Sequence, residues 1–195
     1  MSTYKFFSIL AGVIFTLAFV PYIRAIVQKK TKPAKASWVI WASLDTITFA
    51  AMAVKGTING QIASAIVCAW SVAILAMIFG TKGWTELDKA CLAGALLGVG
   101  LWLAFNDAIF GIIVGQLVIF LGSIPTFRNA WRNPEHENKT AWFLYWLSCF
   151  PAVFAASKQM TFESLAQPIN FFLIESVMVY LLFIRKPKNV CKSGE

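Results

Sequence analysis

Seven apolar segments, each of about membrane-spanning length, occupy most of this chain and restrict the folds open to it. They cover residues 6–27, 36–54, 62–80, 87–105, 108–128, 140–156 and 166–184. An α-helix needs about 20 apolar residues to cross about 30 Å of hydrocarbon. Composition agrees, because 58% of the 195 residues are hydrophobic and only 13% are charged, against roughly a quarter charged in soluble domains. We therefore expect a multi-pass membrane protein without a soluble domain.

The basic residues predict how these segments are oriented. Of the 17 lysines and arginines, only Lys5, Lys55 and Lys158 fall on the predicted side of the N-terminus. The positive-inside rule then places the N-terminus outside and the C-terminus in the cytoplasm, in a plasma or inner membrane. Basic residues that flank helices also account for the net charge of +8. We therefore expect the lipid bilayer, and no nucleic acid, as the partner of these charges.

The first three and the last three segments share one arrangement of residues, which indicates an internal repeat. The matching pairs are Pro21 with Pro125, Arg24 with Arg128, Lys35 with Lys139, and Trp38 with Trp142. This predicts an all-α transmembrane fold of seven helices arranged 3+1+3. Residues 6–80 and 108–184 would form two parallel triple-helix repeats, 87–105 a linking helix and 186–195 a flexible cytoplasmic tail. A repeat of this kind in a membrane protein is typical of a transport pathway between two halves.

Four of the repeated residues are candidates for moving parts. Proline inside a helix removes one backbone hydrogen bond and permits a kink, so Pro21 and Pro125 are hinge candidates, with a static kink as the alternative. Trp38 and Trp142 lie near helix ends. They are gate candidates, although anchoring at the lipid headgroups is equally typical of tryptophan there.

Two carboxyl groups near the middle of apolar segments are the strongest candidates for binding. Asp45 and Glu175 stand where a charge costs at least about 2.5 kcal/mol to insert. Three roles fit such residues: a proton relay, binding of a cationic or hydroxyl-rich solute, and a structural hydrogen bond to a neighbouring helix. Trp41 shares a helix stripe with Asp45, with Phe49 beside it, and Trp146 lies in the corresponding stripe of the second repeat. We expect these aromatic residues to stack on a solute ring.

The linking helix carries Gly94 and Gly98 at the GxxxG spacing that lets two helix backbones approach closely. This face fits either packing against a repeat in the same chain or a contact between two copies of the chain.

At this point the sequence resembles the SWEET sugar transporters and the wider PQ-loop superfamily. The Ser-Ile-Pro-Thr-Phe-Arg run at 123–128 is similar to the family motif in which Pro-Thr-Phe precedes a basic loop. The Pro-Ile-Asn run that ends at Asn170 is similar to the family's Pro-Asn pattern in the last helix. The resemblance implies that Asn170 contacts the solute and that Phe154 is its aromatic partner. It also implies transport by alternating access.

The residues and the resemblance together predict a facilitator of a small polar solute such as a sugar or an amino acid, with protons as a candidate coupling ion. A vitamin-precursor facilitator of the PnuC type and a non-transporting receptor or scaffold are the alternatives. The four cysteines lack CxxC spacing and His136 is the only histidine, so we expect no metal and no cofactor. Without a nucleophile–base pair we expect no enzyme and no catalytic residue.

Overall fold

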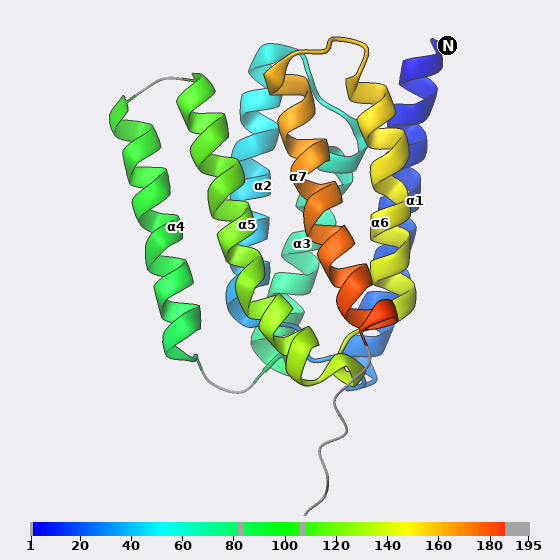
Figure 1. The fold of residues 1–195 in the computed structure, drawn as a ribbon, viewed down its shortest axis with the longest axis vertical. Coiled ribbons are helices and arrows are strands. Elements are labelled where there is room, and N and C mark those ends of the chain that lie inside the picture. Colours follow the sequence, from blue (N-terminus) through cyan, green and yellow to red (C-terminus); the bar gives the residue numbers. More distant parts are fainter. Residues whose placement is uncertain (1, 82–83, 106–107, 186–195) are drawn as a thin grey trace, which may run out of the picture.

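The computed structural model describes residues 2–81, 84–105 and 108–185, and within them every regular element is helical. The seven long helices run alternately up and down the molecule (Figure 1). They are α1 (Thr3–Val27), α2 (Lys35–Lys55), α3 (Gly60–Phe79), α4 (Glu86–Phe105), α5 (Ala108–Arg132), α6 (Lys139–Ala156) and α7 (Phe162–Val179). A short 3₁₀ turn, η1 (Pro134–His136), precedes α6, and a π-helical turn, η2 (Tyr180–Ile184), extends α7. The all-helical prediction is confirmed for these residues, and the predicted tail at 186–195 lies outside them.

Four of the described helices are long and apolar enough to cross a membrane, where the sequence predicted seven crossings. These four are α1, α3, α5 from Ile112 onward, and α7 with its π-helical extension. The other three, α2, α4 and α6, have 21, 20 and 18 residues.

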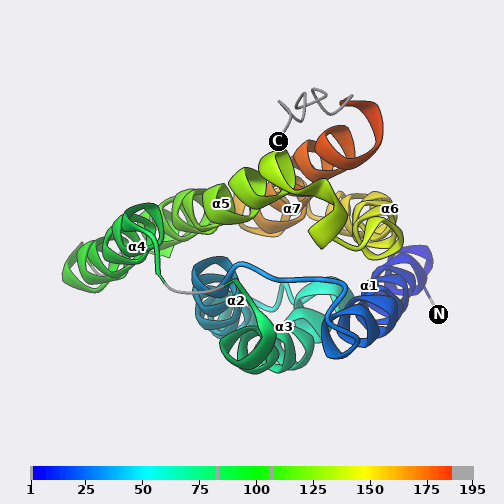
Figure 2. The same ribbon diagram turned by 90° about the horizontal axis from the view of Figure 1, so that it is seen from below.

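The helices pack in two facing layers (Figure 2). In the first layer α3 lies between α1 and α2, and in the second α7 lies between α5 and α6. The layers meet where α1 packs against α6 and where α2 packs against α5. The remaining helix, α4, packs beside α5 at one end of the second layer. A space between the two layers is thus bordered by six helices.

Side chains in the connecting loops define several helix starts. Asn59 accepts a hydrogen bond from Ile62 N at 3.0 Å, and Asn138 accepts one from Ala141 N at 2.9 Å. Such caps satisfy backbone N–H groups that the first turn of a helix leaves unpaired. Pro21 and Pro125, the hinge candidates, both lie inside continuous helices, α1 and α5. Their predicted hinge motion stays a prediction.

Two glycines allow α1 and α3 to approach closely in the first layer. A Cβ atom on Gly12 would lie 2.6 Å from the carbonyl oxygen of Gly60, and one on Gly60 would collide with the Ser8 carbonyl. The Ser64 hydroxyl donates to the Gly12 carbonyl at 3.1 Å across the same contact. By contrast, a Cβ on Gly94 in α4 would meet no atom within 4 Å. Close packing within the chain, one of the two readings of the GxxxG pair, is therefore not found at Gly94. The surroundings of Gly98 lie outside the described part, and the contact between copies stays a prediction.

We expect Gly12→Ala to destabilise the protein by about 2 kcal/mol, as overpacking of a tight interface typically does. The rigid Gly60 backbone cannot move away unless α1 and α3 separate. The matched change Gly94→Ala removes a glycine from a helix without a collision, and should be neutral or stabilising by less than about 1 kcal/mol. Thermal unfolding of both variants in detergent micelles measures the difference. Equal unfolding temperatures would contradict the close contact.

Candidate functional site

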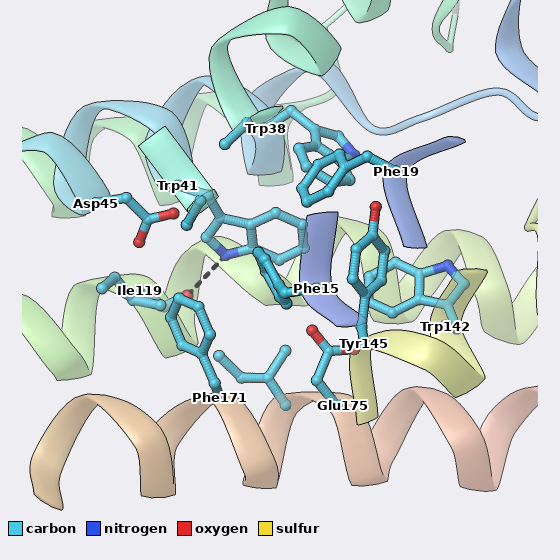
Figure 3. A pocket seen from close by; sticks show the side chains of 13 residues that line it. Phe15, Phe19, Trp38, Trp41, Asp45, Ile119, Trp142, Tyr145, Phe171 and Glu175 are labelled. Carbon is cyan, nitrogen blue, oxygen red and sulfur yellow. Dashed lines mark hydrogen bonds between the residues drawn. The ribbon is translucent and has the colours of Figure 1, made fainter. Parts of the chain in front are cut away.

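A small cavity of about 40 Å³ lies between the two layers and is bordered by every long helix except α4 (Figure 3). This space suffices for one or two water molecules, whereas small-molecule sites typically enclose about 300–1,000 Å³, so the layers would have to move apart to admit a larger solute. Its walls are mainly aromatic and comprise Phe15, Phe19, Trp38, Trp41, Trp142, Tyr145 and Phe171. Ala65 and Ala69 from α3 also line it and leave space for an occupant.

Two carboxyl groups reach this cavity from opposite layers. Asp45 comes from the middle of α2 and is 3% exposed, and Glu175 comes from α7 and is 7% exposed. Asp45 Oδ1 and Glu175 Oε2 are buried without a hydrogen-bond partner among the described residues. The third role suggested for these acids, a structural bond to a neighbouring helix, is therefore not made by these two oxygen atoms.

Two further polar atoms of the cavity lining are unpaired within the described part of the chain. They are Trp38 Nε1 and the Tyr145 hydroxyl. The other two indoles are already engaged, because Trp41 Nε1 donates to Ile119 O at 3.2 Å and Trp142 Nε1 donates to Glu137 at 2.9 Å. The large majority of buried polar groups in proteins are hydrogen-bonded. Four residues of the cavity lining therefore each carry a polar atom that a polar occupant could satisfy.

Next to the cavity lining, on the side of the basic loops before α2 and α6, a buried glutamate joins the two layers. Glu137, just before α6, accepts hydrogen bonds through Oε2 from Trp142 Nε1 at 2.9 Å and from the Tyr22 hydroxyl at 3.2 Å. Asn138 Nδ2 donates to the Pro21 carbonyl at 3.2 Å beside it. Burial raises the pKa of Glu137 to about 7, although the hydrogen bonds from Trp142 and Tyr22 favour its charged form. This loop closure connects α1 of one layer to the start of α6 in the other.

At the opposite end of the helices, a network of buried amide side chains also joins the layers. Asn59 Nδ2 donates to Gln167 Oε1 at 2.8 Å, and Gln167 Nε2 donates to Gln61 Oε1 at 3.2 Å. Gln61 Nε2 in turn donates to the Ser148 hydroxyl at 2.9 Å. Hydrogen bonds thus join the two layers near both ends of the helices.

The structure brings five of the sequence-predicted residues to the cavity. Three come from the α2 stripe, namely Trp38, Trp41 and Asp45, and the other two are Trp142 from α6 and Glu175 from α7. Trp38 and Trp142 are almost fully buried, so they are not positioned as anchors at lipid headgroups. Their predicted role at a gate is compatible with Trp142 contacting both the cavity and Glu137.

Four other predicted residues do not line the cavity. Trp146 Nε1 donates to the Ser176 hydroxyl at 3.0 Å, and Phe49 packs beside the core. Phe154 is 45% exposed and stacks on Tyr4, with ring centroids 5.6 Å apart.

The fourth of these, Asn170, is turned toward α5. Its Nδ2 donates to the backbone carbonyl of Gln116 at 3.0 Å and to Gln116 Oε1 at 2.9 Å. Five residues along a helix of 3.6 residues per turn separate two side chains by about 140°. Glu175 faces the cavity with Phe171 and Ile174, so Asn170 necessarily points elsewhere.

Several residues of the site are not signalled by the sequence. Phe15, Phe19 and Phe171 line the cavity, but an apolar ring on a membrane helix can face lipid or protein. Glu137 lies in a polar loop that resembles a solvated connection. Its only sequence signal is its place immediately before Asn138, the cap of α6. No cluster of three or more His, Cys, Asp or Glu side chains that could hold a metal occurs in the described ranges.

Comparison of the chain with protein-family models, with curated proteins and with solved structures gives no match.

Proposed function

We propose that this protein is a membrane transporter of a small polar solute, built on the plan of the SWEET and PQ-loop transporters. All seven long helices would cross the bilayer, with the N-terminus outside and the C-terminus in the cytoplasm. The solute would occupy the cavity between the layers and reach each side of the membrane in turn. The single observation that carries the proposal is a buried cavity with four unpaired polar atoms between two layers of helices.

The packing of the helices supports a 3+1+3 plan with two parallel repeats. Exchanging α1 with α5, α2 with α6, and α3 with α7 preserves the main contacts within and between the layers. The contact of α1 with α6 becomes that of α5 with α2, and the position of α3 between α1 and α2 becomes that of α7 between α5 and α6. An axis along the membrane normal relates parallel repeats in this way, and α4 remains as the linking helix.

The two closures support alternating access. The loop closure around Glu137 and the amide network around Gln61 each join one layer to the other. Breaking either set of hydrogen bonds would open one side of the cavity while the other set holds the opposite side shut. Pro21 lies beside the loop closure, because its carbonyl accepts from Asn138. A bend of α1 at this proline would therefore act directly on the closure.

The cavity also bears on the alternatives. A receptor or scaffold could pack the region around Asp45 without space, whereas here Asp45 borders a cavity of about 40 Å³. A vitamin-precursor facilitator of the PnuC type would fit the same helix plan. It differs from the leading proposal only in its solute, and a solute panel separates the two.

Uptake into liposomes that contain the purified protein tests this proposal. We expect uptake of at least one solute in a panel of sugars, amino acids, vitamin precursors and small amines to exceed uptake by empty liposomes. The double variant Asp45→Asn/Glu175→Gln should reduce that uptake at least tenfold, because both carboxyl groups border the solute. A matched variant, Glu86→Gln/Glu135→Gln, changes two exposed carboxyl groups and should transport normally. Equal uptake by both double variants would remove the acids from the pathway, and no uptake of any solute would contradict transport.

A further inference from the structure

We propose that the solute is an organic cation, either a quaternary ammonium or a protonated amine. The inference rests on the proposed function for the location of its site and deepens it by naming the class of solute.

The cavity is lined by acidic groups and by no basic ones. Asp45 and Glu175 are its only ionisable side chains apart from Tyr145, and no lysine, arginine or histidine borders it among the described residues. Neither carboxyl forms an ion pair within that part of the structure. A buried carboxylate is normally paired with a positive charge, and a cationic occupant would supply that partner to these two acids.

The walls of the cavity suit a cation for a second and independent reason. Rings from both layers surround the space, among them the indoles of Trp38, Trp41 and Trp142. The face of an aromatic ring attracts a positive charge within about 6 Å of its centroid, and tryptophan does so most strongly. Aromatic cages of this kind are a recurring means of binding quaternary ammonium groups.

The hydrogen-bonding groups of the cavity disfavour the other solute class, a hydroxyl-rich molecule. A sugar presents hydroxyl groups on every side of its ring, and each would need a partner once buried. Apart from the two acids, the free hydrogen-bonding side-chain groups of the lining are limited, among the described residues, to Trp38 Nε1 and the Tyr145 hydroxyl, because the indoles of Trp41 and Trp142 are already used. Most of the remaining wall is aromatic carbon. An ammonium group, by contrast, needs only the acceptors that the two acids provide.

The placement of the acids also explains how a cation would stabilise the closed state. Asp45 belongs to the first layer and Glu175 to the second, so a cation between them attracts both layers at once. Without it, two acidic groups face one apolar space from opposite sides. Binding of the solute would therefore favour closure around it.

Two pairs of compounds with matched shape test the inference on the purified full-length protein. Choline is compared with 3,3-dimethylbutan-1-ol, in which carbon replaces the charged nitrogen, and benzylamine with benzyl alcohol. Quenching of tryptophan fluorescence and the shift in unfolding temperature report binding, since three tryptophans line the cavity. We expect at least one cation to bind at least tenfold more tightly than its neutral partner. Asp45→Asn and Glu175→Gln should each remove most of that preference, whereas the exposed-site change Glu135→Gln should keep it.

Parallel measurements with glucose and alanine separate this inference from the proposed function. Suppose that glucose or alanine binds and is taken up by liposomes, and that neither cation is preferred over its neutral partner. This result would contradict the inference of a cationic solute and leave the proposed transport function intact. Preferred binding of a cation without uptake of any compound would support the inference of a cationic ligand and contradict the proposed transport function. Failure of both cations to bind better than their neutral partners overturns the inference in every case. Circular dichroism of each variant checks that its helices are intact.

Discussion

Replacing Ala69 with phenylalanine will reduce solute uptake to the rate of empty liposomes. Ala69 lines the cavity from α3 and is 3% exposed, so the added ring would enter the space that the solute needs. The ring would also enter an aromatic environment, in which edge-to-face contacts are favourable. We therefore expect the variant to keep its helices, at a cost in stability of about 1–3 kcal/mol from overpacking. Uptake and thermal unfolding measured on one preparation separate a blocked pathway from a lost fold.

Ala63→Phe is the matched control for this experiment. Ala63 lies on the same helix but is exposed on the outside of the bundle, so its replacement adds the same ring without filling the cavity. Uptake by Ala63→Phe should equal that of the wild type. If Ala69→Phe folds and still transports, the cavity between the layers is not the pathway.

The second large effect concerns Glu137 and the dependence of stability on pH. Burial raises the pKa of Glu137 in the folded protein from 4.5 to about 7. The folded state therefore binds a proton more tightly than the unfolded state does. The resulting stabilisation is complete below pH 4.5, falls as the pH rises toward 7, and is absent above it. At about 1.4 kcal/mol for each pH unit, the full effect is about 3 kcal/mol.

We expect the wild type to unfold at a higher temperature at pH 5 than at pH 8, and Glu137→Gln to lose most of this difference. The glutamine amide has the shape of the protonated carboxyl and can accept from Tyr22 and Trp142 as the glutamate does. The variant should therefore be more stable than the wild type at pH 8. Glu135→Gln removes an exposed carboxyl two residues away and should follow the wild type at each pH. Parallel pH profiles for wild type and Glu137→Gln would show that this site does not titrate as expected.

The same titration bears on the loop closure. Above pH 7 the charged Glu137 is costly to keep buried, so the closure between α1 and α6 would open more readily on that side. In liposomes, the rate of uptake should then depend on the pH of the compartment that this side faces. The Glu137→Gln variant should lose that dependence.

The sequence alone was sufficient to predict the helical class and the inward direction of the most polar residues. A carboxyl group in the middle of an apolar helix is costly in lipid wherever the helix lies, so Asp45 and Glu175 were predicted to face protein. Trp38 and Trp41 share one stripe of α2 with Asp45, and the structure places all three at the cavity. These inferences depend on single helices and on the cost of transfer into lipid, which residue type determines.

Tertiary structure alone decided the features that depend on how helices pack against one another. The rotation of α7 turned Glu175 into the cavity and Asn170 toward Gln116, although the sequence made both candidates. Phe15 and Phe154 are indistinguishable by residue type, yet one lines the cavity and the other is exposed. The free energy of a phenyl ring differs little between a position facing protein and one facing lipid. Residue type therefore does not determine which way the ring points. The closure around Glu137 joins residues far apart in the chain. Its hydrogen bonds between α1 and the start of α6 form only once these two helices pack side by side.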